Sequence, residues 1–206
     1  MFYELHTHSN CSDGIPHPDE IVDYAKAIGL SGIAITDHNV IEGSLEALKL
    51  ASADFTVIPG VEVSSVEGHI LALNVRELVP RDMPAGETVE RIHSLGGIAI
   101  AAHPYDLWRK GVGDLVLNLD FDAIEVYNGH TFGNSRNPVE AAGEVGLPMV
   151  GGSDAHTLGE IASVKVSVEG DVIESIKSGR VGIVKDALPT LLMKHAKGLV
   201  RRKILG

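Results

Sequence analysis

Short apolar runs alternate with stretches of helical period along most of the chain. The runs predict strands at residues 2–5, 32–36, 56–58, 69–75, 98–102, 123–127, 148–151, 162–168 and 181–184. The periodic stretches predict helices at residues 19–28, 44–51, 88–95, 139–145 and 188–203. In the first helix Ile21, Ala25 and Ile28 share one face, and Gly29 is placed to end it. This alternation favours an α/β fold of successive βα units rather than hairpins.

The length and composition predict a single domain over residues 1–206. A chain of 206 residues that is 44% hydrophobic can close one sizeable core, whereas two domains would leave both small. The lone cysteine, Cys11, cannot form an internal disulfide, and the chain opens without a basic start followed by an apolar run. No apolar stretch approaches the ~20 residues that cross a bilayer. We therefore expect a cytoplasmic protein that does not associate with membranes.

The charge distribution argues against general binding to a phosphate backbone, because the formal net charge is −11. A local exception is the basic segment 188–206, which holds five basic and no acidic residues: Lys194, Lys197, Arg201, Arg202 and Lys203. We interpret it as a C-terminal helix with an apolar stripe of Leu192, Ala196 and Leu199 and a solvated basic face. A role in binding nucleic acid is the alternative.

Side chains able to bind metals follow the ends of most predicted strands. In chain order they are His6 and His8, Asp37 and His38, Glu62, His103, Asn128, and Asp154 with His156. In a barrel of parallel strands these ends converge on one face, where barrel enzymes place their chemistry. His69 begins its predicted strand and fits this arrangement less well.

The residue types indicate a multinuclear metal site. The spacing of His6 and His8 lets two imidazoles on one side of an extended segment reach a single cation. Imidazole mixed with carboxylate suits Zn, Mn or Fe, whereas Mg and Ca prefer oxygen ligands. Several carboxylates close together repel one another, and bound cations relieve that repulsion. Two or three divalent cations are therefore expected.

The motifs resemble those of the polymerase and histidinol phosphatase (PHP) family over essentially the whole chain. They are, in the family's order, His-Thr-His-Ser, Ser-Asp-Gly, Ile-Thr-Asp-His, Gly-Val-Glu, Ala-His-Pro and Gly-Ser-Asp-Ala-His. The resemblance implies a distorted seven-stranded, TIM-like (β/α)7 barrel with a trinuclear metal centre. By this resemblance the first metal takes His6, His8, Glu62 and Asp154; the second takes Glu62, His69 and His103; the third takes Asp13, His38 and His156.

The resemblance also implies a reaction. A metal-bridging water or hydroxide attacks the phosphorus in line, and His8, His156 or a metal-bound water protonates the leaving group. Asp37 is interpreted as an orienting partner rather than a ligand. Many relatives have histidine at the position of Asp13, and the subgroup with aspartate includes phosphatases of small nucleotide-derived phosphates. Asp13 in Ser-Asp-Gly could equally belong to an ordinary turn.

Substrate-binding residues are predicted in the loops that follow the strands. Arg109 and Lys110 follow His103, Arg136 follows Asn128, and these cations could bind phosphate. Asn128 is assigned to the same group, whereas ordinary solvated charges are the alternative for the cations. The short loops favour a small or extended substrate. We treat the remaining histidines as non-ligands, although His130 could approach the pocket mouth: His17, His93, His130 and His195.

The leading hypothesis is a phosphatase or phosphodiesterase for a small metabolite or nucleotide. An exonuclease acting on nucleic-acid ends uses the same metals and gives the basic segment 188–206 a purpose, and a histidinol-phosphatase-like enzyme is a further alternative. An amidohydrolase-like barrel typically uses a bridging lysine, and no lysine occupies the last position of a predicted strand. A non-enzymatic metal-binding or regulatory domain would be expected to have lost ligands, but all nine positions are filled.

Overall fold

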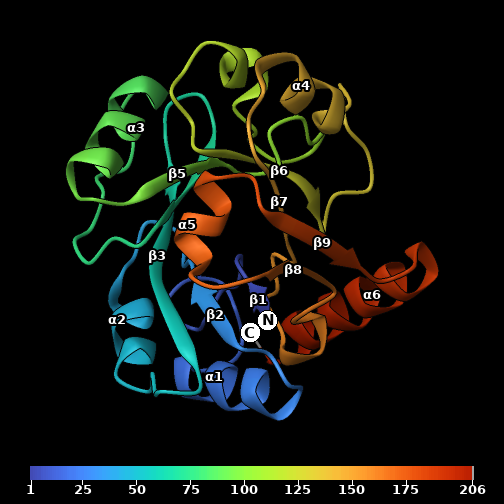
Figure 1. Ribbon diagram of the computed structural model, residues 1–206. Helices are drawn as coiled ribbons and strands as arrows, with labels where there is room; N and C mark the ends of the chain where they lie inside the picture. Colours follow the sequence, from blue (N-terminus) through green and yellow to red (C-terminus); the bar gives the residue numbers. More distant parts are fainter. Residues whose placement is uncertain (206) are drawn as a thin grey trace.

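The computed structural model describes residues 1–205, and one curved sheet organises that part of the chain (Figure 1). Its nine strands are β1 (Phe2–Glu4), β2 (Gly32–Ile35), β3 (Thr56–Ser64), β4 (His69–Leu73), β5 (Ile98–Ala101), β6 (Ala123–Asn128), β7 (Met149–Gly152), β8 (Val164–Val168) and β9 (Val181–Lys185). The helices are α1 (Pro18–Ala27), α2 (Glu42–Leu48), α3 (Ala85–Ser94), α4 (Pro138–Val145), α5 (Val172–Lys177) and α6 (Leu188–Leu205). The α/β class is confirmed.

The strand order within residues 1–205 is β7-β6-β5-β4-β3-β2-β1-β8-β9. Strands β1, β2 and β3 are parallel, as are β5, β6 and β7, but β4 and β8 run against their neighbours. The expectation of successive βα units is therefore wrong at β4 and β8, and the expectation of no hairpins is wrong at β3 and β4. The seven-stranded count implied by the family resemblance is also wrong, whereas the nine strands predicted from the apolar pattern are confirmed.

The reversal of β4 follows from the short connection between β3 and β4. Only residues 65–68 join the two strands, and the amide of Ser65 donates to the carbonyl of Gly68 at 3.0 Å. A parallel crossover needs a dozen or more residues, so this connection can only form a hairpin. Because β4 runs backwards, its first residue, His69, lies at the edge where the parallel strands end. This explains how His69 reaches the metal-binding residues.

Strand β3 is longer than predicted and changes partner halfway. Residues 56–59 pair with β2 in parallel, and residues 60–64 pair with β4 in antiparallel register. Pro59 and Gly60 predicted the end of the strand, yet the chain continues through them because a new partner takes over. Glu62 therefore lies within β3 rather than after it.

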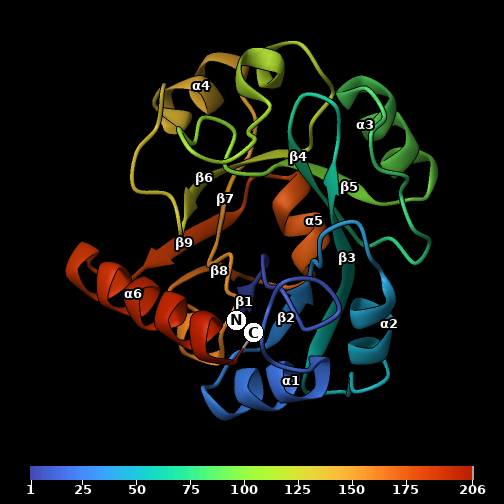
Figure 2. The same ribbon diagram turned by 180° about the vertical axis from the view of Figure 1, so that it is seen from behind.

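The two ends of the sheet approach one another to form a nearly closed barrel (Figures 1 and 2). Ser153, directly after β7, donates its hydroxyl to the carbonyl of Val164 at 3.0 Å and accepts from the Val164 amide at 3.1 Å. The interior contains apolar residues from the strands together with Val172 and Ile176 of α5. Helix α5 therefore closes one end of the barrel and leaves the other end for polar residues.

Helix α5 was not predicted from the sequence. It has six residues, and Asp171 caps it by accepting the amide of Glu174 at 3.0 Å. The Asp-Val-Ile-Glu pattern that begins it is a helix-start signal. The apolar side of this short helix, with Ile176 fully buried, serves the barrel interior.

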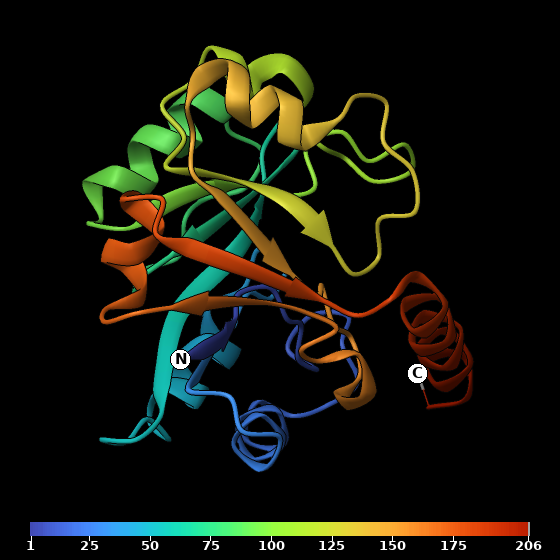
Figure 3. The same cartoon turned by 45° about the vertical axis from the view of Figure 1, so that its right-hand side comes forward.

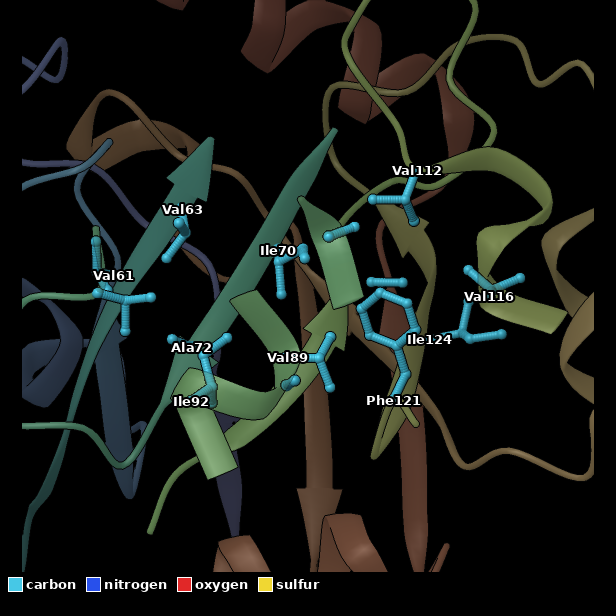
Figure 4. Close-up of a cluster of buried hydrophobic side chains, with 14 of the residues drawn as sticks. Val61, Val63, Ile70, Ala72, Val89, Ile92, Val112, Val116, Phe121 and Ile124 are labelled. Atoms are coloured by element: carbon cyan, nitrogen blue, oxygen red, sulfur yellow. The ribbon is translucent and has the colours of Figure 1, made fainter. Parts of the chain in front are cut away.

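The other helices cover the outside of the sheet. Helices α1 and α2 pack over β2 and β3, and α3 and α4 pack over β4 to β6 (Figure 1). Figure 4 shows the second of these layers, where Val89 and Ile92 of α3 meet Ile70 and Ala72 of β4. Helix α6 lies on the side toward which β6, β7 and β9 point (Figure 3). Within residues 1–205, no helix combines the length and apolar character needed to cross a membrane.

Candidate metal centre

The segment after β1 carries two histidines into the open end of the barrel. Thr7 bridges to Ala155, and its carbonyl accepts the amide of Thr36 at 2.8 Å, so the segment stays extended. In an extended segment the side chains of His6 and His8 lie on one side and that of Thr7 on the other. Both imidazoles are fully buried.

Glu62 lies at the centre of the site, and its two carboxylate oxygens contact different sets of imidazoles. Oε2 lies 3.2 Å from His6 Nε2, 3.3 Å from His8 Nε2 and 3.1 Å from His38 Nδ1. Oε1 lies 3.0 Å from His69 Nδ1 and 3.1 Å from His103 Nε2. A carboxylate placed in this way can bridge two cations, one on each oxygen.

Two aspartates complete the polar cluster. Asp154 Oδ1 lies 3.1 Å from His8 Nε2, 3.6 Å from His6 Nε2 and 3.7 Å from His156 Nδ1. Asp13 Oδ2 lies 3.2 Å from His156 Nε2, and its Oδ1 lies 3.8 Å from His8 Nδ1 and 3.9 Å from His38 Nε2. Asp154 has φ +54° and His103 has φ +30°, conformations that are costly outside glycine and that concentrate at functional sites.

The buried donor atoms fit divalent cations. Six of them have no hydrogen-bond partner among the described residues: His6 Nε2, both ring nitrogens of His8, Glu62 Oε2, His69 Nδ1 and His103 Nδ1. Burial of so many unpaired polar atoms is expensive unless an ion binds them. Ligand atoms lie within 4.8 Å of one another in three groups: His6 with His8 and Asp154; His38 with Glu62 and His69; and His8 with Asp13, His38 and His156. These groups hold eight of the nine predicted ligands, and the ninth, His103, lies 3.1 Å from Glu62 Oε1.

The electrostatics of this cluster favour bound cations or protons. Burial lowers the pKa of His6 and His8, but nearby carboxylates outweigh it: the pKa of His6 lies well above its usual value and that of His8 is raised to about 9. Burial raises the pKa of Glu62 and Asp154, but other groups hold both well below their usual range: the imidazoles around Glu62, led by His6, and around Asp154 His6 followed by the Arg109 guanidinium. Without metal, protons on His6 and His8 offset the charge of the carboxylates. Metal binding must displace them.

Glu125 of β6 positions two of the predicted ligands and was missed in the sequence. Its Oε1 lies 3.0 Å from His6 Nδ1, while its Oε2 accepts the amide of His103 at 2.8 Å and Nδ2 of Asn128 at 3.0 Å. An imidazole held at one nitrogen presents the other to a metal. The signal was present, because Glu125 is the one charged residue in the apolar run Ala-Ile-Glu-Val-Tyr.

Asp37 positions a loop rather than an imidazole. Its carboxylate accepts the amide of Ser9 at 2.7 Å, the hydroxyl of Ser9 at 2.6 Å and the hydroxyl of Ser12 at 2.7 Å. These bonds fold the segment that carries Asp13 back over the site. Asp13 itself is half-exposed, unlike the buried ligands.

The cavity above this cluster has a volume of about 450 Å³, and one of the four predicted substrate-binding residues lines it. Arg109 lies there, and its guanidinium donates to Asp154, to Asp106 at 2.9 Å, to Asn128 at 2.9 Å and to Thr131 at 2.6 Å. Asn128 lies beneath it, joining Arg109 to Glu125.

The other two basic residues that were predicted to bind substrate lie outside the cavity lining. Arg136 pairs with Asp114 and Glu144, each at 2.6 Å, and Lys110 has an exposed side chain outside the cavity lining. His93 pairs with Asp122 at 2.8 Å away from the site, and His17 contacts Asn10 on the surface. His130 and His195 both line the cavity, which agrees with the expectation that His130 could approach the pocket mouth. That neither histidine is a metal ligand stays a prediction.

Comparison with known proteins gives matches along most of the chain. Residues 4–106 match the model of the PHP domain, and residues 137–181 match a PHP-associated model. An uncharacterized protein of Methanocaldococcus jannaschii is 37% identical over 63% of this chain and 83% of that protein. A 5'-3' exoribonuclease of Salmonella typhimurium is 35% identical over 44% of this chain, and the match spans 34% of its length. A crystal structure from Bacteroides vulgatus shows a two-domain protein that contains a predicted PHP-like metal-dependent phosphoesterase. The match covers 96% of this chain and 69% of that protein, with a TM-score of 0.75 and 19% identity, which indicates a shared fold.

Proposed function

Because this chain belongs to the PHP family, we propose that it is a metal-dependent phosphoric ester hydrolase acting on a small phosphorylated metabolite or nucleotide. The observation that carries the proposal is Glu62, whose two buried oxygens face separate imidazole sets. Phosphoryl transfer needs positive charge on both sides of the phosphorus, and a bridging carboxylate is how a protein holds cations close together.

The proposed ligand sets follow the family pattern. One cation is held by His6, His8, Glu62 and Asp154; a second by Glu62, His69 and His103; a third by Asp13, His38 and His156. The ligand atoms of His38, Glu62 and His69 lie within 4.8 Å of one another, so His38 is close enough to serve the second set. Manganese, zinc and iron suit these donors. When bound, such cations activate water as the nucleophile and offset charge on the phosphoryl oxygens.

The residues of the chain supply binding and orientation. Arg109 presents a guanidinium to the cavity and can bind phosphoryl oxygens through its planar donor fork. His8 and His156 already point their nitrogens at Glu62, Asp154 and Asp13, so both suit cation binding better than delivery of a proton to the leaving group. Glu125 fixes the ring of His6, and Asp37 fixes the loop of Asp13.

A 5'-3' exoribonuclease is the second candidate function, favoured by the similarity to the enzyme of Salmonella typhimurium. The formal net charge of −11 weighs against a long nucleic-acid contact, since such contacts require several cations along the phosphate backbone. Steep loss of oligoribonucleotide cleavage with rising salt would support this second function. Cleavage of small esters with shallow salt dependence would support the first.

Turnover of p-nitrophenyl phosphate and of its bis-ester by manganese-loaded protein tests the proposal. We expect hydrolysis that chelation abolishes and that His103→Ala reduces roughly a hundredfold or more, because this substitution removes one imidazole at Glu62 Oε1. His93→Ala is a matched control, since His93 pairs with Asp122 away from the site. Absence of turnover of either ester and of a 5'-phosphorylated oligoribonucleotide with manganese, zinc and iron would contradict the proposal.

A further inference from the structure

Helix α6 is packed against residues that lie next to the candidate metal centre. Gly198 presses on the carboxylate of Glu160 so closely that a Cβ at this position would overlap it. Glu160 in turn accepts the amide of His156 at 3.1 Å and lies 3.1 Å from His130 Nε2. The His195 ring meets the His130 ring edge-on with 4.5 Å between centroids. A single residue, Glu160, therefore separates α6 from the proposed ligand His156.

This packing places two polar groups of α6 at the cavity. His195 and Arg202 both line it, together with the proposed metal ligands. His195 Nδ1 and Arg202 Nε are buried, and neither has a hydrogen-bond partner among the described residues. Buried donors without partners are costly, and a ligand that supplies oxygen atoms would remove that cost.

The two arginines at the cavity, Arg109 and Arg202, differ in the number of partners that their guanidinium groups have within the protein. Arg109 is bonded to Asp106, Asn128, Thr131 and Asp154. Arg202, by contrast, pairs with no carboxylate within the described residues. A guanidinium beside a cavity without a carboxylate partner is suited to an anion brought by the ligand.

We propose that α6 belongs to the active site and that Arg202, with His195, forms a second anion subsite for a substrate that carries a further phosphate group beyond the scissile ester. This inference rests on the proposed function. The rings of Trp108 and Phe132 line the same cavity and offer an apolar surface to the carbon skeleton between the two phosphates. Helix α6 lies outside both family-matched segments, 4–106 and 137–181, so the subsite distinguishes this chain from the shared centre.

The test compares propyl phosphate with 1,3-propanediol bisphosphate, two substrates that differ only in the second phosphate. Phosphate release by manganese-loaded protein gives kcat and KM for Arg202→Ala and for wild type. We expect Arg202→Ala to raise KM for the bisphosphate about tenfold and to leave propyl phosphate unchanged, since hydrogen bonds to a charged group are lost only with the former. Arg202→Lys should recover part of the difference. A 5'-phosphorylated dinucleotide tests whether a backbone phosphate diester occupies the subsite instead.

Arg201→Ala is the matched control, because Arg201 has the same charge on the same helix but does not line the cavity. Equal effects on both substrates, or an Arg201→Ala effect as large as that of Arg202→Ala, would overturn the inference. Calorimetric binding of the bisphosphate and of inorganic phosphate gives an independent readout. If no substrate is turned over, the proposed function fails, and the subsite fails as well only if Arg202→Ala leaves bisphosphate affinity unchanged.

Discussion

Glu125→Gln tests how the barrel interior prepares an imidazole for metal. Glu125 Oε1 lies 3.0 Å from His6 Nδ1, and Oε2 accepts two donors, the amide of His103 at 2.8 Å and Nδ2 of Asn128 at 3.0 Å. A glutamine has only one acceptor oxygen. If that oxygen keeps the two donors, its NH2 group faces His6 Nδ1 and moves the ring proton to Nε2, the atom that faces Glu62 and Asp154. If the amide turns over, two buried donors lose their acceptor.

Either orientation weakens metal binding without changing a ligand. Loss of such a supporting partner typically costs 10–100-fold in metal affinity, which is about 1.4–2.7 kcal/mol. Competition with a fluorescent chelator measures this affinity for manganese and zinc. Glu4→Gln is the matched control, because Glu4 is equally buried but bonds no imidazole: it accepts backbone amides, that of His6 among them, and the Ser153 hydroxyl. A metal affinity for Glu125→Gln equal to that of wild type would refute the reasoning.

Three further perturbations probe other parts of the molecule. The pKa of His8 is raised to about 9 in the folded protein, so protonation of His8 stabilises the metal-free fold. This contribution to the free energy of unfolding is fully present below about pH 6.5 and is lost as the pH rises through about 9. Thermal melts of metal-free protein should therefore fall in Tm over that window while manganese affinity rises, and a flat pair of curves would count against the assignment. Asp13→Ala should lower the bound-metal count by one without unfolding the protein, and unchanged stoichiometry by mass spectrometry would exclude Asp13 as a ligand. Ile176→Ala should cost about 2–5 kcal/mol in urea unfolding but leave metal affinity intact, and a cost below about 1 kcal/mol would show that α5 does not close the barrel.

The elements of the fold were largely predictable from the sequence because the apolar runs are short and well separated. All nine strands overlap the predicted runs, since β-branched runs bounded by turns leave few alternatives, although β3 extends to Ser64. Strand direction was not predictable. The four residues between β3 and β4 force a hairpin, but Pro59 and Gly60 obscured where β3 ends and so hid how short that connection is.

The metal ligands were predictable from short sequence motifs, whereas the residues that orient those ligands lie outside such motifs. His6, His8 and Asp154 stand in short motifs whose residue types and spacing favour metal binding over other roles, whereas Glu125 is one residue in an apolar strand. The substrate-binding Arg and Lys side chains were harder to predict, because a sequence shows that a residue is charged but not which residue it pairs with. Arg136 pairs with Asp114, which lies 22 residues earlier in the chain, and with Glu144 of α4. Arg202 reaches the cavity because α6 packs beside it, although the lining residues outside that helix lie far away in the sequence.

Metal titration of activity tests the central claim most directly. Manganese is added stepwise to metal-free protein, and p-nitrophenyl phosphate hydrolysis is measured at each molar equivalent. The geometry around Glu62 predicts little activity at one equivalent, a rise with the second, and a plateau at two or three. Full activity at one equivalent, or hydrolysis that persists after the metal has been removed, would contradict a catalytic centre built on a shared carboxylate.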